Sequence, residues 1–294
     1  MTAATAKPAS FSEDNSDDLV IARMAACPDA RLQAVLASIV RHLHAAVREI
    51  EPTEEEWMAA IGFLTETGQM CDDRRQEFIL LSDTLGVSML VDAINNRKSR
   101  AATESTVLGP FHVAGAPHRA LGETICLDGK GAPLVVSGMV RDAGGAPIPG
   151  ATLDVWQAND DGFYDVQQPG TQPDMNLRGV FTTDAEGRYW FRSVKPLFYA
   201  IPHDGPVGRL LHALGRHPYR PAHIHFIVAA SGYRPVTTHI FPEDDPYLDS
   251  DAVFGVKDSL ILPFELIDDA EAAARHGVAN PFWAVEADFV LDRA

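Results

Sequence analysis

The stretch LVVSGMVRDAGGAPIPGATLDVW, residues 134–156, decides the fold. Two runs rich in β-branched residues, 134–140 and 151–156, flank a segment of glycines and prolines that favours turns. Further runs of the same kind, separated by turn signals, are residues 187–191, 223–228 and 236–241. Many short strands at turn-like intervals are typical of a β-sandwich.

The sequence before about residue 100 has a different texture. Between Asp29 and Ile50, apolar residues recur every three to four positions, which predicts an amphipathic helix. Thr53 and Glu56 have the spacing of a capping box that starts a second helix. A third helical segment is expected roughly over residues 73–95. We therefore expect a mixed α and β chain, with an N-terminal helical domain over residues 1–100 and an antiparallel β-sandwich domain over residues 101–294.

Composition limits the partners and the compartment. The 294 residues carry a formal net charge of −17, and such a surface repels nucleic acid and anionic membranes. The three cysteines are far apart and match no metal or redox pattern. No stretch reaches the length of a membrane span, and the N-terminus does not look like a secretory signal. We therefore expect a cytoplasmic protein that binds neither nucleic acid nor membrane.

His223 and His225 are the first candidates for a metal site. Side chains alternate across a strand, so the two imidazoles should lie on one face and can share a metal ion. The pair alone leaves the other ligands open. A carboxylate such as Asp165 would suggest Fe(II) or zinc, whereas tyrosinate would favour a trivalent ion. The spacing does not choose among the six tyrosines.

Four ordered motifs resemble the intradiol ring-cleavage dioxygenases, in the branch of the catechol and hydroxyquinol 1,2-dioxygenases. The motifs are GATLDVWQA at 150–158, DGFYD at 161–165, YAIPHDGP at 199–206 and GRHPYRPAHIH at 215–225. The resemblance covers nearly the whole chain, including the helical N-terminal region.

The resemblance implies a metal centre and a reaction. It implies that O2 and an aromatic diol are the substrates. The metal that it implies is Fe(III), held by four ligands: Tyr164, Tyr199, His223 and His225. It also implies that Tyr199 accepts a substrate proton and that Arg220 lies beside the substrate. A fixed cation there can stabilise negative charge that develops on the ring.

The motif Thr237-Thr238-His239 narrows the expected substrate. Catechol 1,2-dioxygenases commonly read Thr-Thr-Gln there, and the hydroxyquinol branch resembles this chain in carrying His. The resemblance therefore implies that His239 takes part in catalysis. The expected substrate is hydroxyquinol (benzene-1,2,4-triol), giving 3-hydroxy-cis,cis-muconate, the enol form of maleylacetate. A catechol or chlorocatechol 1,2-dioxygenase is the alternative.

A triol needs a polar partner for its additional hydroxyl, because burying an unpaired hydroxyl costs free energy. Asp83, after an apolar run on the third helical segment, is the candidate, and an exposed helix position is the alternative. The family pattern implies that the rest of the substrate pocket consists of Leu80, Val107, Gly109, Pro110, Phe111, Ile201, Pro202, Arg220 and Val253.

Two further interpretations stay open. Sequences like those of residues 138–151 and 184–189 also occur in transthyretin-like modules, which are binding domains without a metal. The amphipathic N-terminal helices need a partner for their apolar faces. In the family they pair two subunits and often enclose a lipid, which implies a homodimer with bound phospholipid. Packing on the chain's own sandwich would satisfy the pattern equally well.

Overall fold

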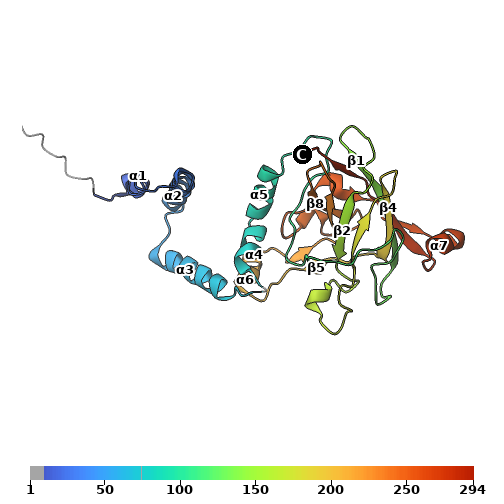
Figure 1. Ribbon diagram of the computed structural model, residues 1–294. Coiled ribbons are helices and arrows are strands. Elements are labelled where there is room, and N and C mark those ends of the chain that lie inside the picture. Colours follow the sequence, from blue (N-terminus) through green and yellow to red (C-terminus); the bar gives the residue numbers. More distant parts are fainter. Residues whose placement is uncertain (1–9, 74) are drawn as a thin grey trace, which may run out of the picture. The chain divides into compact units, whose positions relative to one another are not determined.

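The computed structural model describes residues 10–73 and 75–294 and divides into two units, residues 1–66 and 67–294 (Figure 1). The first unit is helical. Its elements are the 3-10 helix η1 (Glu13–Asn15), α1 (Ser16–Ala22), α2 (Ala30–Ile50) and most of α3 (Glu54–Gln69).

Local capping sets the helix boundaries in the first unit. The Asp29 carboxylate accepts hydrogen bonds from the N–H groups of Arg31 and Leu32, and α2 ends at Glu51, whose φ is 48°. The predicted capping box is confirmed: the Glu56 carboxylate accepts from the Thr53 N–H at 2.8 Å, and the Thr53 hydroxyl accepts from the Glu56 N–H at 3.2 Å.

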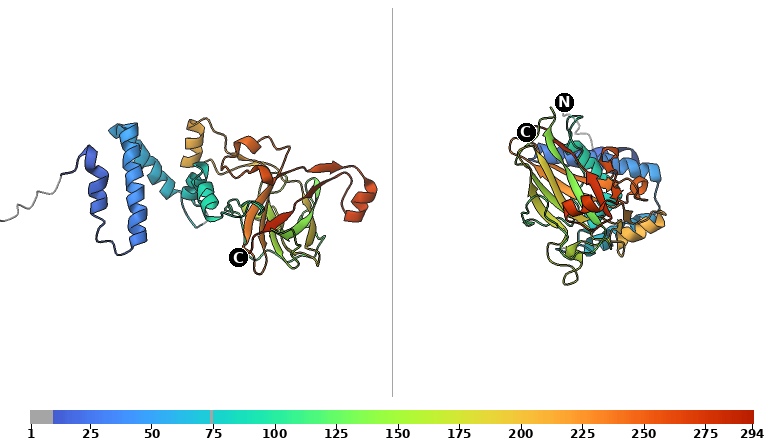
Figure 2. Two further views of the ribbon diagram at one scale, coloured as in Figure 1. Left: turned by 90° about the horizontal axis from the view of Figure 1, so that it is seen from above. Right: turned by 90° about the vertical axis from the view of Figure 1, so that its right-hand side faces the viewer.

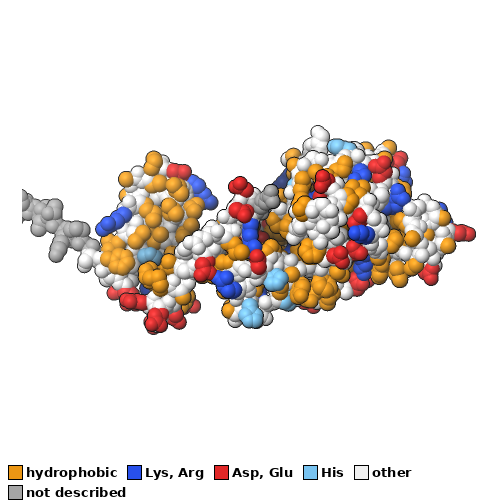
Figure 3. All heavy atoms as spheres, turned by 90° about the horizontal axis from the view of Figure 1, so that it is seen from below, with side chains coloured by type: hydrophobic (Ala, Val, Ile, Leu, Met, Phe, Trp, Pro, Cys, Tyr) orange, Lys and Arg blue, Asp and Glu red, His pale blue; other side chains and the backbone are white. Residues whose placement is uncertain are grey.

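The apolar face of α2 is exposed to solvent. Apolar side chains gather over the helices of the first unit (Figure 3). On α2 they are Leu32, Leu36, Ile39, Leu43, Val47 and Ile50, and all six are exposed. The predicted amphipathic helix is therefore present, and this unit leaves its apolar stripe uncovered.

The third helical segment is two helices, so the expectation of one continuous segment over residues 73–95 was wrong. Helix α4 (Glu77–Thr84) ends at a turn, and α5 (Val87–Asn95) begins after Gly86. Gly86 has a φ of 73°, a left-handed conformation that interrupts the helix and that side chains with a Cβ adopt rarely. Helix α6 (Pro206–Ala213) packs against α4, where the Glu77 carboxylate accepts the Val207 N–H (Figure 2).

Two five-stranded sheets form the second unit. The first has the order β10-β11-β1-β12, with β4 also paired to β1. Its strands are β1 (Pro133–Asp142), β4 (Arg188–Val194), β10 (Glu265–Ile267), β11 (Phe282–Glu286) and β12 (Phe289–Leu291). The second has the order β3-β2-β7-β8-β9. Its strands are β2 (Thr152–Gln157), β3 (Arg178–Thr182), β7 (Ile224–Ala229), β8 (Val236–Pro242) and β9 (Ile261–Leu262).

Shorter elements lie between these strands in the chain. Strand β5 (Tyr199–Ala200) pairs with β6 (Tyr219–Arg220), and α7 (Ala270–His276) lies between β10 and β11 in the chain. Three 3-10 helices complete this unit: η2 (Asp165–Gln167), η3 (Leu248–Ser250) and η4 (Asp258–Leu260).

The predicted β-sandwich is confirmed. The inner faces of both sheets share one apolar core, which includes Leu134 and Val136 of β1 and Leu153 and Val155 of β2. Most pairings are antiparallel, but β1 pairs with β11 and β12 in parallel, as β8 does with β9. The sequence did not predict the parallel pairings, because residue alternation carries no information about strand direction.

Alternation also determines where polar side chains lie on the second sheet. Leu153 and Val155 point into the core, so Asp154 and Trp156 must point to the outer face. Trp156 is directly opposite His225 on β7, and His225 is directly opposite His239 on β8. The three aromatic rings therefore form a row on the outer face of this sheet.

Along the chain, the boundary between the two units falls between Glu66 and Thr67, so α4 and α5 belong to the second unit. The functional division near residue 100 stays a prediction. Among the described helices, none is long and apolar enough to cross a membrane.

Candidate metal centre

The four predicted metal ligands converge. The Tyr164 hydroxyl lies 2.8 Å from His225 Nε2, and 3.4 Å from both His223 Nε2 and the Tyr199 hydroxyl. The two histidine Nε2 atoms are 3.1 Å apart. Four donor atoms from three separate parts of the chain therefore face a common point.

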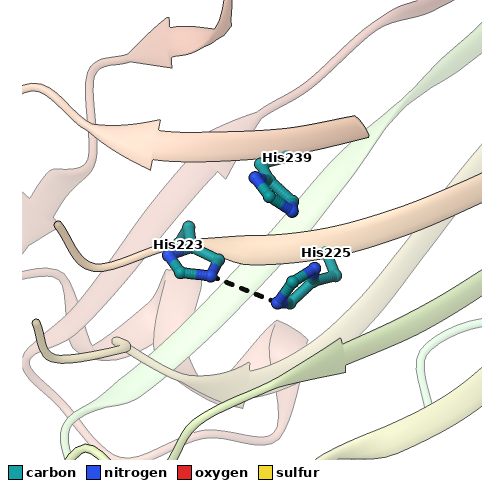
Figure 4. Close-up of side chains that lie close together, drawn as sticks. All are labelled: His223, His225 and His239. Atoms are coloured by element: carbon teal, nitrogen blue, oxygen red, sulfur yellow. Dashed lines mark hydrogen bonds between the residues drawn. The ribbon is translucent and has the colours of Figure 1, made fainter. Parts of the chain in front are cut away.

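The two predicted histidine ligands lie side by side, as the alternation of an extended chain requires (Figure 4). His223 Nδ1 lies 2.8 Å from the Pro221 carbonyl, to which it can donate, and this contact leaves Nε2 free to face the centre. His225 differs. Its Nδ1 is buried and has no hydrogen-bond partner among the residues that the structure describes.

His239 is a third imidazole at the same place (Figure 4). One ligand atom from each of the three histidines lies within 4.8 Å of the others. The His239 ring stands nearly perpendicular to that of His225, at 88°. Neither of its ring nitrogens makes a well-formed hydrogen bond within the described chain, although the Val107 carbonyl lies near enough to interact. A buried imidazole whose nitrogens make no well-formed hydrogen bond, close to a cluster of donors, is available to a ligand.

The electrostatics favour neutral imidazoles and a protonated Tyr164 phenol in the absence of a cation. Burial lowers the pKa of all three histidines well below its usual value, and neighbouring positive charge adds to the shift. Burial, with the nearby Tyr199, raises the pKa of Tyr164 well above its usual value. Neutral imidazoles are ready to bind a metal, whereas ionising the phenol requires a strongly polarising ion. The donor set therefore fits a metal site.

Arg220 places a fixed positive charge beside these donors. Its guanidinium is buried and lies 3.3 Å from His223 Nε2. Burial alone would lower the pKa of Arg220, but the carboxylate of Asp251 outweighs it and raises the pKa. Asp251 accepts from Arg220 Nε at 3.1 Å and from the N–H of Gly255 at 2.8 Å. The cation is therefore held in place and cannot turn away to solvent.

The predicted apolar pocket residues fall into two groups. Leu80, Ile201 and Val253 pack in one cluster next to Asp251. Three other predicted residues contact the donor side chains or approach them. Phe111 stacks on Tyr164 with ring centroids 4.5 Å apart, a Cβ at Gly109 would lie 3.4 Å from the His225 ring, and Val107 borders His239.

The remaining predicted pocket residues form no hydrogen bond or ring contact with the four donor side chains in the described part of the chain. Pro110 is exposed, and Pro202 is half-buried next to Ile201. Asp83 is half-buried on α4, where burial raises its pKa, and a hydrogen bond with Ser88 and the positive charge of Arg220 oppose that shift. Asp83 is therefore not the exposed helix residue of the alternative interpretation, and its place in the substrate pocket stays a prediction.

Several hollows lie in the second unit, and two of them bear on the location of the site. One of about 460 Å³ is lined in part by Asp251 and Phe254, so it adjoins the carboxylate that holds Arg220. A larger one of about 630 Å³ is lined mainly by residues 96–105, and none of the four predicted ligands borders it. None of the four predicted ligands lines the smaller hollow either, so neither hollow marks the donor cluster.

The structure removes Asp165 from the candidate ligands. Its carboxylate accepts a hydrogen bond from Arg178 Nε at 2.9 Å and another from the Met175 N–H at 3.1 Å. Both side chains of the Asp165–Arg178 pair are buried. The interpretation as a two-histidine, one-carboxylate site is therefore wrong for this residue.

Sequence reasoning missed Asp251, Trp156 and His112. Asp251 is 31 positions from Arg220. Trp156 stacks on His225, with ring centroids 4.4 Å apart and planes 12° apart. His112 lies 3.0 Å from the Asp154 carboxylate and meets Trp156 edge-on. All three lie within or at the end of stretches that resemble the family, but the sequence did not indicate which contacts they make.

Comparison with known proteins identifies the class. A family model described as "Dioxygenase" matches residues 107–293, and one described as "Catechol dioxygenase N terminus" matches residues 29–103. The chain belongs to this family, the intradiol ring-cleavage dioxygenases, and is an enzyme of that kind. The interpretation as a transthyretin-like binding module is therefore wrong.

Three relatives narrow the comparison. The chain is 62% identical to the hydroxyquinol 1,2-dioxygenase of Rhizobium sp. (strain MTP-10005), over 96% of each chain. It is 52% identical to the 6-chlorohydroxyquinol 1,2-dioxygenase of Cupriavidus pinatubonensis, over 85% of this chain and 91% of that protein. Among solved structures it resembles the hydroxyquinol 1,2-dioxygenase of Pseudomonas putida DLL-E4, with a TM-score of 0.91, 49% identity, and coverage of 96% of this chain and 99% of the other.

Proposed function

We propose that this chain is an Fe(III) intradiol dioxygenase that opens hydroxyquinol to 3-hydroxy-cis,cis-muconate, with both atoms of O2 entering the product. The observation that carries the proposal is the convergence of two phenols and two imidazoles on one point. The relatives named hydroxyquinol and 6-chlorohydroxyquinol 1,2-dioxygenase support the choice of substrate. Catechol or chlorocatechol is the alternative substrate.

The donor set is the argument for Fe(III). Phenolates are hard anionic oxygen donors that suit a trivalent ion, and catalase holds its iron with one. Tyr164 and Tyr199 would supply the two phenolates, and His223 and His225 the two neutral imidazoles. When bound, Fe(III) acts as a Lewis acid that draws electron density from the diol and so prepares its ring for O2.

Tyr199 has the position of the base. Of the four predicted ligands it is the most accessible, with 8% of its surface exposed against 0–2% for the others. A diol that reaches the centre therefore meets Tyr199 first. We assign the Tyr199 Oη to the acceptance of one proton from a substrate hydroxyl.

Arg220 and the apolar cluster act on the ring. The guanidinium, fixed by Asp251, stabilises negative charge that develops on the substrate. The packed side chains of Leu80, Ile201 and Val253 would exclude water and contact the apolar edge of the ring. These residues act by position, because none of them carries a proton in the reaction.

Asp83 and His239 carry the preference for a triol. The Asp83 carboxylate faces Arg220 and can accept a hydrogen bond from the additional hydroxyl. His239 supplies unpaired ring nitrogens in the place where the catechol branch commonly has Gln. Catechol offers no group to Asp83, so its binding leaves a half-buried carboxylate without that partner.

Oxygen uptake tests the proposal directly. The purified protein, loaded with iron, is assayed with hydroxyquinol, catechol and 4-chlorocatechol side by side. We expect the largest kcat/KM with hydroxyquinol and a ring-opened dicarboxylate as its product. A higher kcat/KM with catechol would favour the alternative, and no uptake with any diol would contradict the proposal.

We also propose that the exposed stripe of α2 pairs two chains into a homodimer with bound phospholipid. An exposed apolar stripe of six large side chains is unusual on a monomer surface. Acyl chains are a chemically suitable filling for any gap between such faces. A cytoplasmic location remains our expectation.

A further inference from the structure

No protein group that the structure describes forms a hydrogen bond with the second ring nitrogen of His225. Histidine ligands almost always donate their second ring N–H to a carboxylate, a carbonyl or a water molecule, and this contact fixes the ring. His223 follows the rule through the Pro221 carbonyl at 2.8 Å. His225 Nδ1 is buried and unpaired within the described chain, so other contacts must fix its ring.

Those contacts are aromatic and come from its neighbours on the sheet. Trp156 lies parallel to the His225 ring, with centroids 4.4 Å apart. His239 meets it edge-on from the other side, with centroids 4.2 Å apart. The backbone at Gly109 covers it so closely that a Cβ there would lie 3.4 Å from the ring. The orientation of His225 therefore depends on what keeps Trp156 and the segment around Gly109 in place.

Residues 107–112, which we call the strap, cross the outer face of the second sheet. Before the strap, the Thr106 N–H bonds to the Thr237 carbonyl of β8. Beyond it, the Arg119 N–H bonds to the Val180 carbonyl of β3. The sheet order is β3-β2-β7-β8, so the chain must pass over β7 and β2 between these two points. This path takes the strap directly over the row of aromatic rings.

A hydrogen bond between side chains ties the strap to the sheet. His112 Nε2 lies 3.0 Å from the Asp154 carboxylate. Asp154 is two residues before Trp156 on β2, and it therefore points to the same face. The His112 ring also meets the Trp156 ring edge-on, with centroids 4.7 Å apart. The His112 side chain thus joins the strap to the sheet and also packs against the Trp156 indole, which stacks on His225.

We propose that the His112–Asp154 pair positions the predicted metal ligand His225 by holding a tryptophan ring against its imidazole. The inference rests on the proposed iron site and adds to it a positioning residue outside the donor set. Loss of the pair lets the strap lift and the indole tilt, and His225 then turns away from the other donors. The iron is held less tightly, although all four ligands are still present.

The test compares His112→Ala with His118→Ala in the iron-loaded protein. His118 is an exposed histidine that follows the strap in the chain, and it serves as the matched control. Two quantities are measured: the rate of iron loss to excess EDTA, and the shape of the tyrosinate-to-iron charge-transfer band. We expect His112→Ala to lose iron about tenfold faster than wild type, as supporting residues around metal ligands typically do. Its band should shift and broaden, whereas His118→Ala should behave as wild type.

Two further variants separate positioning from general destabilisation. His112→Gln keeps an N–H donor within reach of Asp154 and should restore slow iron loss. Asp154→Asn removes the charge with little change in shape, and it replaces His112→Ala if that variant does not fold. It should speed up iron loss in the same direction.

The possible failures are distinguishable. If His112→Ala and Asp154→Asn lose iron within twofold of His118→Ala, with an unchanged band, the inference is overturned and the iron site stands. If the wild-type protein shows no charge-transfer band after loading with iron, the proposed function itself is wrong.

Discussion

Replacement of Asp83 by alanine should weaken the preference for a triol and leave the metal centre intact. Asp83 lies on α4 within the electrostatic influence of Arg220 and Asp251, and it is not among the converging donors. A hydrogen bond to a charged group contributes about 1.5–3 kcal/mol. Each 1.4 kcal/mol is a factor of ten, so the ratio of kcat/KM for hydroxyquinol over catechol should fall by about 10- to 150-fold.

The assay is oxygen uptake with both substrates at matched iron content. Asp83→Asn keeps the shape and one acceptor oxygen, and it should give an intermediate ratio. Asp249→Asn, at an exposed position, serves as the control for loss of one negative charge. An Asp83→Ala ratio equal to that of the control would refute the role of Asp83 in substrate choice.

The pH dependence gives an independent check on Asp83. Burial raises the pKa of this carboxyl above its usual value. As the pH falls through the raised pKa, Asp83 gains a proton and stops being a charged acceptor. The wild-type preference for hydroxyquinol should therefore decline toward low pH, whereas the ratio for Asp83→Ala should stay flat over the same range.

Further substitutions test separate parts of the account. Tyr164→Phe should abolish most of the visible charge-transfer band, and an unchanged band would exclude this tyrosine as a ligand. Arg220→Ala should lower kcat by about 10²–10³ without bleaching the protein, as loss of a preorganised electrostatic contact does; a normal kcat would contradict this role. Gly86→Ala should lower the free energy of unfolding by about 1 kcal/mol in urea titrations, because of its φ of 73°, and unchanged stability would show that the turn adapts. Leu36→Glu should yield monomers in light scattering if α2 pairs two chains, whereas Ala45→Glu on the opposite side should not.

Local patterns predicted much of the fold. Asp29 and the Thr53–Glu56 box mark helix starts through hydrogen bonds that span two or three residues, so the sequence contains the whole interaction. The common orientation of His223 and His225 follows from strand geometry in the same way. Gly86 was not recognised as a break, because an isolated glycine inside a helical pattern is often tolerated.

The candidate site was less accessible to local reasoning. Tyr164 and Tyr199 entered only through family motifs, since nothing near them in the sequence distinguishes a ligand from a core aromatic. Asp251 fixes Arg220 from 31 positions away. The stack of Trp156 on His225 depends on the register between β2 and β7. Register and long-range pairing are set by the whole fold, so neither could be predicted from residue spacing.

The most direct test of the central claim is a titration of the apoprotein with Fe(III), followed by visible absorption. Four donors at one point, two of them phenols, predict stoichiometric uptake and a red-brown tyrosinate-to-iron band. Hydroxyquinol added without O2 should shift that band, because the substrate displaces a ligand. A colourless protein after titration, or a band that hydroxyquinol leaves unchanged, would contradict the account.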